Sequence, residues 1–372
     1  MRIVLAPDSF KGTLSAAEVC AIEEEAIRKV LPDAQLVSLP LADGGEGTLD
    51  VIALARPEAK RVVVNCHDPL GREITAEYLR LPDGTAIVEL AQASGLQLLA
   101  PEERNPLKAN TFGTGELILH ALKNGCRKLI VGLGGSATVD GGLGLVAALA
   151  GSSIDKVKEM ASQELDSIFF SNILNHIKGI GSELQVTIAS DVTNPLLGPN
   201  GAAAVFGPQK GATPEMVEIL EQRLRQWASL WHDDGNQPGD GAAGGGGFIL
   251  RKLFPHCQTV SGGELVCELA ALDKELADAD LVITGEGTSD AQTLNGKLPL
   301  IVSQHARNAN VPCALLSGYL SPTAKIAIKP HFHYLDGTLA MPPASPDLTH
   351  EACEKRLVQT IQHLVQTILD KS

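Results

Sequence analysis

The 372-residue chain has few aromatic side chains, no basic cluster and no long apolar run, and each absence excludes a class of protein. Phe, Trp and Tyr together make up 3% of the residues, so a base-stacking surface for nucleic acid is not expected. The formal net charge is −14, which argues against nucleic acid and acidic membranes as partners. No apolar run reaches the length of a transmembrane helix. We therefore expect small-molecule partners.

The sequence also lacks CxxC pairs, and its first residues are not expected to act as a secretory leader. Its seven cysteines are scattered and odd in number, a pattern typical of reduced, buried thiols in a cytosolic protein. The first residues predict a strand at 2–6, and the charged residues Asp8 and Lys11 follow it, unlike the apolar core of a signal peptide. These features predict a cytoplasmic location.

Several well-known catalytic signatures are missing. The chain has no GxSxG, no HExxH and no Walker A sequence, and no GxGxxG stands between a predicted strand and helix. A Rossmann-type oxidoreductase is therefore only a weak alternative. None of the ten histidines lies in the loops described next, so a histidine base is not expected.

Glycine is abundant, with 37 residues, and six of them lie in the stretch Gly132–Gly144 (GLGGSATVDGGLG). An apolar run at 128–131 predicts a strand before it, and 145–149 predicts a helix after it. Glycine N–H groups can approach an anion closely, and a helix N-terminus adds partial positive charge. Asp140 must face a cation, a hydroxyl proton or a backbone N–H, and capping of the next helix is its alternative role.

Similar loops follow predicted strands at 6–13, 40–48, 132–142, 189–202 and 284–297. In open α/β sheets, ligands bind outside the carboxyl ends of the strands. Any single acid in such a loop is more often a cap or a solvated charge, but acids recur within a few residues of Gly or Thr in all of these loops. Glycine N–H groups, lysines and several carboxylates together suit phosphoryl transfer.

The pattern of elements predicts two α/β domains, as the chain length also favours. Both ends alternate strands and helices, whereas 61–66, 74–81 and 86–90 predict a meander of short strands. We expect a Rossmann-like, doubly wound parallel-sheet domain from 1–63 plus 265–372. A second, mixed α/β domain, 64–264, would be inserted in it.

The motifs taken in order resemble the class I glycerate kinases, also called glycerate 2-kinases, over almost the whole chain. They are APDSFKGTLSA, PLADGGEGT, GTGELI, GGSATVDGG, DVTNPLLGPNGA, FGPQKGA and TGEGTSDAQTLNGK. The resemblance implies transfer of phosphate from ATP, with Mg²⁺, to D-glycerate to give 2-phosphoglycerate. It also implies an active site in the cleft between two domains. We expect a monomer or homodimer.

With this resemblance, the candidate residues receive roles. Catalytic roles are assigned to Asp43, Asp191, Asp290 and Lys11; cofactor binding to Gly134, Gly135, Ser136, Thr138, Asp140 and Lys297; substrate binding to Asp8, Ser9, Glu46 and Gln292; and metal binding to Asp191 and Glu286. We expect Asp43, Asp191, Glu286 and Asp290 to converge in one cleft.

The chain departs from the family pattern in three places. Thr288 stands where the family usually has arginine, Val139 where it usually has asparagine, and the segment after Ala150 lacks the usual glycines. Two alternatives therefore remain: a kinase for a related hydroxy acid, or a divergent paralogue that binds a nucleotide or sugar acid with little turnover.

Overall fold

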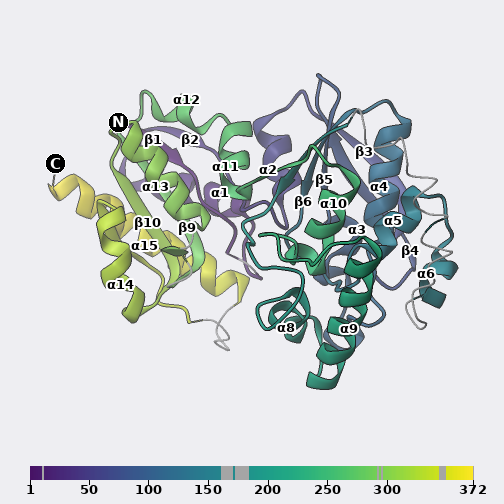
Figure 1. Ribbon diagram of the computed structural model, residues 1–372. Helices are drawn as coiled ribbons and strands as arrows, with labels where there is room; N and C mark the ends of the chain where they lie inside the picture. The colour runs from purple at the N-terminus through teal and green to yellow at the C-terminus, as the bar shows by residue number, and fades with distance from the viewer. Residues whose placement is uncertain are drawn as a thin grey trace. The chain divides into compact units, whose positions relative to one another are not determined.

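The computed structural model forms two compact units, coloured along the chain in Figure 1. It describes residues 1–10, 12–160, 171, 184–290, 293–294, 296–342 and 349–371. Unit 1 comprises Met1–Asp43, Asp50–Arg56 and Gly262–Ser372, and unit 2 comprises Gly44–Leu49 and Pro57–Ser261. The boundary predicted at residue 63 falls inside β3 (Lys60–His67), because β3 pairs with β4 along its whole length and belongs to unit 2.

Unit 1 is built on a five-stranded sheet in the order β11-β10-β9-β1-β2, with all neighbours parallel. The strands are β1 (Arg2–Leu5), β2 (Gln35–Ser38), β9 (Leu281–Ser289), β10 (Cys313–Leu320) and β11 (Tyr334–Thr338). From β1 the chain moves to one side, and from β9 it moves to the other. The carboxyl ends of β1 and β9 therefore flank a topological switch point, where open α/β sheets bind ligands.

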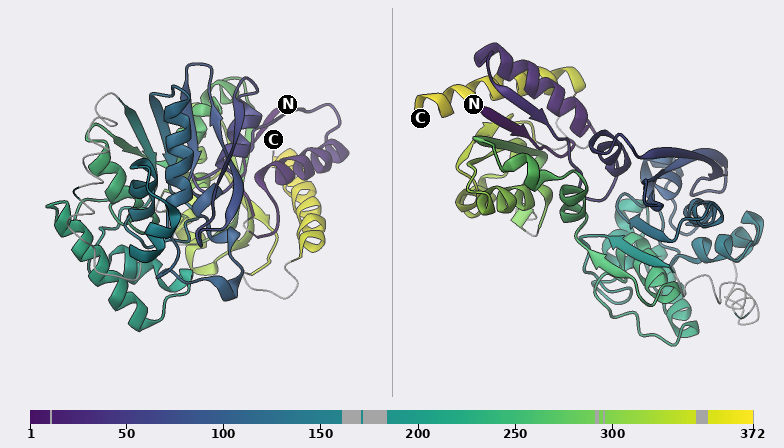
Figure 2. Two further views of the ribbon diagram at one scale, coloured as in Figure 1. Left: turned by 90° about the vertical axis from the view of Figure 1, so that its right-hand side faces the viewer. Right: turned by 90° about the horizontal axis from the view of Figure 1, so that it is seen from above.

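Helices cover both faces of this sheet. On one face α1 (Ala16–Val30) packs against α15 (His350–Lys371), and their apolar residues form one core with β1, β9 and β10. On the other face α13 (Leu298–Asn308) contacts β9 and β10, as the right-hand view of Figure 2 shows. The remaining helices are α2 (Thr48–Ala55), α11 (Gly262–Leu269), α12 (Leu272–Leu276) and α14 (Pro322–Ile328). The α/β architecture predicted from the alternating elements is confirmed.

Unit 2 contains a six-stranded mixed sheet in the order β3-β4-β5-β6-β7-β8. Its further strands are β4 (Glu73–Arg80), β5 (Thr85–Glu89), β6 (Lys128–Gly132), β7 (Gln185–Ala189) and β8 (Gln258–Val260). The pairs β3–β4 and β4–β5 are antiparallel, which confirms the predicted meander, and the pairs from β5 to β8 are parallel. The carboxyl ends of β5, β6 and β7 consequently lie along one edge.

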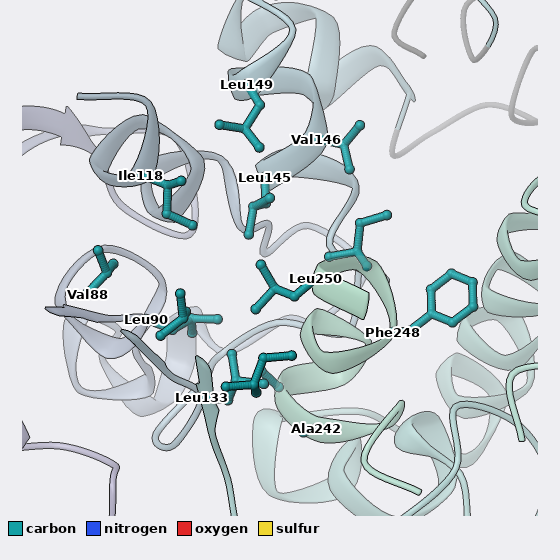
Figure 3. Packing of buried hydrophobic residues seen from close by; sticks show 14 of the residues in the cluster. Val88, Leu90, Ile118, Leu133, Leu145, Val146, Leu149, Ala242, Phe248 and Leu250 are labelled. Carbon is teal, nitrogen blue, oxygen red and sulfur yellow. The ribbon is translucent and has the colours of Figure 1, made fainter. Parts of the chain in front are cut away.

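Apolar side chains from the sheet and its helices form the core of unit 2. Figure 3 shows residues of β5, α4, α5 and α10 meeting in this cluster. The helices are α3 (Ala91–Ser94), α4 (Phe112–Lys123), α5 (Leu143–Leu149), α6 (Ile154–Met160), α8 (Ala202–Phe206), α9 (Pro214–Leu230) and α10 (Gly246–Leu253). The glycine-rich segment that leads into the first turn of α10 allows close backbone approach, since a Cβ at Gly247 would lie 2.1 Å from the Gly239 oxygen. No helix of the described residues is long and apolar enough to cross a membrane.

Candidate active site

A cavity of about 350 Å³ lies in unit 1 beside the carboxyl ends of β1 and β9. We call it the unit 1 pocket. It is lined by Asp8, Ser9, Phe10, Thr13, Asp43, Glu286, Gly287, Thr288, Lys297, Leu298, Gly318, Met341 and Cys353. The size suits a small ligand. Of the predicted site residues, Asp8, Ser9, Asp43, Glu286 and Lys297 are brought together here.

Glu286 is the most enclosed acid of the pocket, with 6% of its surface exposed. Its Oε1 accepts hydrogen bonds from Ser289 Oγ at 3.0 Å and Thr293 Oγ1 at 2.8 Å. Its Oε2 lies 3.3 Å from Lys297 Nζ. Burial raises the pKa of Glu286, while Lys297 and the two hydroxyls oppose the shift. The carboxylate is thus held in one orientation beside a cation.

Lys297 directly precedes α13 and occupies its N-cap position. Besides Glu286, its Nζ lies 3.2 Å from the Thr288 oxygen and 3.5 Å from Asp290 Oδ1. The side chain is one-third exposed and lines the pocket, so it presents positive charge to a ligand. Because Lys297 lines the pocket and contacts Asp290, Asp290 lies next to the pocket.

The predicted loop 284–297 begins later than expected. β9 continues to Ser289, and Glu286 and Thr288 pair with Ser317 and Tyr319 of β10. Two glycines permit this extension, because a Cβ at Gly285 would lie 2.5 Å from the Leu316 oxygen and one at Gly318 2.4 Å from the Gly287 oxygen. Glu286 and Thr288 therefore lie on a strand paired with β10 rather than on a loop.

The loop after β1 is tied to the same strand. The Asp8 N–H donates to the Gly285 oxygen at 2.9 Å, and Asp8 Oδ1 accepts from the Ser9 N–H at 2.7 Å. Asp8 is buried and Asp43 is half-buried. Lys11 and Gln292, both predicted site residues, lie outside the described residues.

The glycine loop, residues 132–144, is the central polar feature of unit 2. A Cβ at Gly134 would lie 2.3 Å from Gly45 Cα, so the loop packs directly on the Gly44–Gly47 turn. It is further fixed by hydrogen bonds from the Leu96 N–H to the Gly135 oxygen and from the Ala137 N–H to the Ser94 oxygen. Gly135 has φ +73°, a conformation that favours glycine.

Three successive N–H groups of this loop remain available. Within the described residues, the N–H groups of Gly134, Gly135 and Ser136 donate to no acceptor. Glu46, another predicted site residue, is exposed beside Gly135. Successive unpaired backbone N–H groups are a donor set that can bind an anion, and anion binding at this loop stays a prediction.

Two other residues assigned to the cofactor face inward instead. Asp140 accepts hydrogen bonds from the Thr111 N–H, Thr111 Oγ1 and the N–H groups of Gly142 and Gly144, at 2.9–3.1 Å. Burial raises the pKa of Asp140, and these hydrogen bonds oppose the shift. Its position matches the helix-capping alternative, since it joins the starts of α4 and α5. Thr138 is fully buried, with Oγ1 3.4 Å from the Ala243 oxygen.

Lys210 is a polar residue of unit 2 that sequence reasoning missed. It ends a short 3-10 turn (Pro208–Lys210) within FGPQKGA and is 3% exposed. Its Nζ donates to Ser136 Oγ and to the Thr138 oxygen, each at 2.7 Å. Burial lowers the pKa of Lys210 to about 7, with Asp140 opposing the shift. The available signal was a lone lysine enclosed by Gly207 and Gly211.

The acids predicted to converge are divided between the units. Asp43, Glu286 and Asp290 belong to unit 1. Asp191 follows β7 in unit 2 and is exposed. Each unit therefore presents its own group of polar residues at the carboxyl ends of its parallel strands.

Comparisons with known proteins show the family of this chain. The model of the glycerate kinase family matches residues 3–369. The chain is 39% identical to the glycerate kinase of Haemophilus influenzae over 100% of both chains. It is 41% identical to the glycerate 2-kinase of Escherichia coli over 92% of this chain and 90% of that one. A crystal structure of a putative glycerate kinase 2 from Salmonella typhimurium, 38% identical, superposes with a TM-score of 0.78 over 100% of this chain and 99% of that chain. This chain belongs to the glycerate kinase family.

Proposed function

We propose that this protein transfers the terminal phosphoryl group of ATP to the 2-hydroxyl of D-glycerate, giving 2-phosphoglycerate. The observation that carries the proposal is the unit 1 pocket, in which Asp8, Asp43 and Glu286 lie with Lys297 at the switch point of a parallel sheet. Phosphoryl transfer depends on positioning and on compensation of charge, and a lysine among carboxylates supplies both. The names of the relatives support glycerate as the acceptor.

The glycine loop of unit 2 is a second observation that supports the proposal. The available N–H groups of Gly134, Gly135 and Ser136 suit the oxygens of a phosphate or a carboxylate. We propose that this loop and the unit 1 pocket serve the same reaction, as the resemblance to class I glycerate kinases implies. Asp140 and Thr138 would hold the loop in shape rather than touch the nucleotide.

The carboxylates of the unit 1 pocket and Asp191 of unit 2 are of the ligand type that Mg²⁺ prefers. The described residues hold no cluster of three His, Cys, Asp or Glu side chains that would cage a metal ion. Mg²⁺ needs no such cage in kinases, because one or two carboxylates, water and phosphate oxygens suffice. Asp43 and Asp191 are candidates, whereas the contacts of Glu286 with Lys297 favour a role in placing that lysine. The ion would neutralise phosphate charge.

Asp43 is the candidate general base. It lines the pocket and is half-buried, so it can meet a substrate hydroxyl without being fully shielded. In this role its carboxylate accepts the proton of the 2-hydroxyl as the oxygen attacks phosphorus.

The seven cysteines are free thiols, which supports a reducing, cytoplasmic location.

The decisive experiment incubates the purified protein with ATP, MgCl₂ and D-glycerate and follows ADP release, with the product identified by phosphorus NMR. We expect 2-phosphoglycerate. Formation of the 3-phosphate would overturn the assigned position, and absence of any glycerate-dependent ADP release would overturn the proposal. Related hydroxy acids run in parallel test the second candidate function, which Thr288 in the pocket favours because it lacks the charge of arginine.

A further inference from the structure

Lys210 is a buried lysine for which the reaction described above assigns no role. Its two acceptors, Ser136 Oγ and the Thr138 oxygen, are both neutral. Burying an ammonium group without a carboxylate in contact is costly, so packing alone does not explain a lysine at this place. Buried ionisable groups with displaced pKa values cluster at functional sites.

The backbone of the turn that carries Lys210 is held in place by close packing at the glycines on both sides of it. A Cβ at Gly211 would lie 2.3 Å from the Arg104 oxygen, and one at Gly207 would lie 2.3 Å from the Ala203 oxygen. Gly211 also has φ +93°, which a side chain would disfavour. The backbone on both sides of Lys210 is therefore packed against neighbouring carbonyls, and its side chain stays directed at the glycine loop.

The contact between Lys210 and Ser136 sets the direction of the serine hydroxyl. A protonated lysine can only donate, so it occupies a lone pair of Ser136 Oγ. The serine proton must then point to another acceptor. A neutral lysine can instead accept that proton, and the serine would present its lone pairs outward. The charge on Lys210 thus decides whether Ser136 offers a donor or an acceptor.

We propose that Lys210 is a positioning residue that makes Ser136 a hydrogen-bond donor for an anion bound at the glycine loop. The serine hydroxyl then acts together with the available N–H groups of Gly134, Gly135 and Ser136. The chemistry recognised is a cluster of anionic oxygens, supplied by a nucleotide phosphate or by the carboxylate of the hydroxy acid. The inference rests on the proposed function, because it assigns one of those two substrates to this loop.

This arrangement couples anion binding to proton uptake. Asp140 is the charged group of the described residues whose field acts on Lys210, and it favours the protonated form. With a pKa of about 7 in the unliganded protein, Lys210 is partly neutral at physiological pH. A bound anion raises this pKa, so affinity is highest below pH 7. Above it, affinity falls by up to ~10-fold per pH unit until the pKa of the complex is reached.

The test measures dissociation constants by isothermal titration calorimetry at pH 6.5 and 8.5, with ADP as the phosphate probe and D-glycerate as the carboxylate probe. We compare wild type, Lys210→Met and the control Lys123→Met. Lys123 is exposed at the C-terminal end of α4, whereas Asp140 bonds the start of that helix. Methionine keeps a long, unbranched side chain without the charge.

For the probe that occupies the loop, we expect wild type and Lys123→Met to lose roughly 10-fold or more in affinity at the higher pH. Lys210→Met should bind weakly at both values. The probe that shows this difference identifies which substrate uses the loop. Equal affinities and equal pH slopes in wild type and Lys210→Met, for both probes, would overturn the proposal. In steady-state assays the KM of that substrate should rise more than kcat falls.

If Lys210→Met does not fold, Ser136→Ala decides the question, because it keeps the lysine and removes only the hydroxyl. We expect weaker binding at pH 6.5 and a smaller pH slope, and unchanged binding would contradict the inference. The kinase activity of the wild type tests the proposed function separately from the binding measurements. An inactive wild type that still shows Lys210-dependent binding overturns only the reaction, while an active wild type with flat binding overturns only this inference.

Discussion

Lys297 Nζ and Glu286 Oε2 lie 3.3 Å apart, which places a partly exposed cation on a buried carboxylate at the edge of the unit 1 pocket. The two residues come from different elements, since Glu286 is on β9 and Lys297 precedes α13. The strand fixes the acid, and the acid in turn fixes the amine. The amine is thereby aimed at the cavity before any ligand arrives, which is the preorganisation that favours charge stabilisation.

Replacing Lys297 with methionine should lower kcat/KM for ATP by about 10²–10³-fold, the effect of removing one charge-stabilising donor from an active site. The melting temperature should also fall, because Glu286 would remain buried without its cation. Steady-state kinetics and thermal denaturation measure the two effects. Lys325→Met, on the exposed side of α14, is the control and should change neither. Full activity in Lys297→Met would remove Lys297 from the site.

Asp43→Asn should reduce kcat by roughly 10²–10⁴-fold if Asp43 is the base, because the amide cannot accept the hydroxyl proton. The fold should be unaffected, which circular dichroism checks. Asp33→Asn, in the exposed turn after α1, serves as the matched control and should keep wild-type rates. If Asp43→Asn and Asp290→Asn both retain the wild-type rate, the base lies elsewhere.

Thr288→Arg tests the departure from the family pattern. Thr288 lines the unit 1 pocket, where an arginine fork would match the two oxygens of a carboxylate. A hydrogen bond to a charged group contributes about 1.5–3 kcal/mol, roughly 10- to 100-fold in affinity. If this position contacts the acceptor, the KM for D-glycerate should fall while kcat is retained. An unchanged or higher KM would show that arginine at this position has a structural role.

Stability should depend on pH through His305 on α13. Its Nδ1 lies 2.6 Å from Asp273 Oδ1, and its Nε2 lies 2.9 Å from Glu264 Oε2. Burial acts to lower the pKa of His305, but the hydrogen bonds to the two carboxylates outweigh it and raise the pKa. The stabilisation is therefore fully present below the unfolded value of about 6.5 and is lost as pH rises through the folded pKa.

The size of this effect should be modest, on the order of 1 kcal/mol or less, because both carboxylates are exposed. Urea denaturation of wild type and His305→Gln from pH 5.5 to 8.5 measures it. The stability difference between them should shrink as the pH increases. His363→Gln, at an exposed position of α15, should follow wild type throughout. A difference that grows with pH would contradict the assignment.

Local signals in the sequence were sufficient to predict many of the elements of the fold. Ser15 and Glu18 form the predicted capping box at the start of α1, because both partners lie within one helical turn. The end of β9 was not predicted, since its extension depends on pairing with β10, which sequence reading placed in a separate element. Long-range pairing of this kind leaves no periodicity in either segment alone.

In the candidate site, too, some features follow from local sequence signals and others depend on residues far away in the sequence. The glycines of the loop at 132–144 were evident, because backbone approach requires them. Whether Asp140 faced a ligand or capped a helix depended on Thr111, which lies 29 residues away. Lys210 was overlooked because a lone lysine usually lies on the surface, and only the packing of its flanking glycines turns it inward.

The position of β1 between β2 and β9 also determines when the protein can be completed during synthesis. Ile3 pairs with Leu36 on one side and with Leu281 on the other, so the second side stays open while all of unit 2 is translated. Unit 2 has every strand of its own sheet by β8, which ends at Val260. The inserted unit can therefore complete its sheet while β1, the first strand to be made, still lacks its second neighbour.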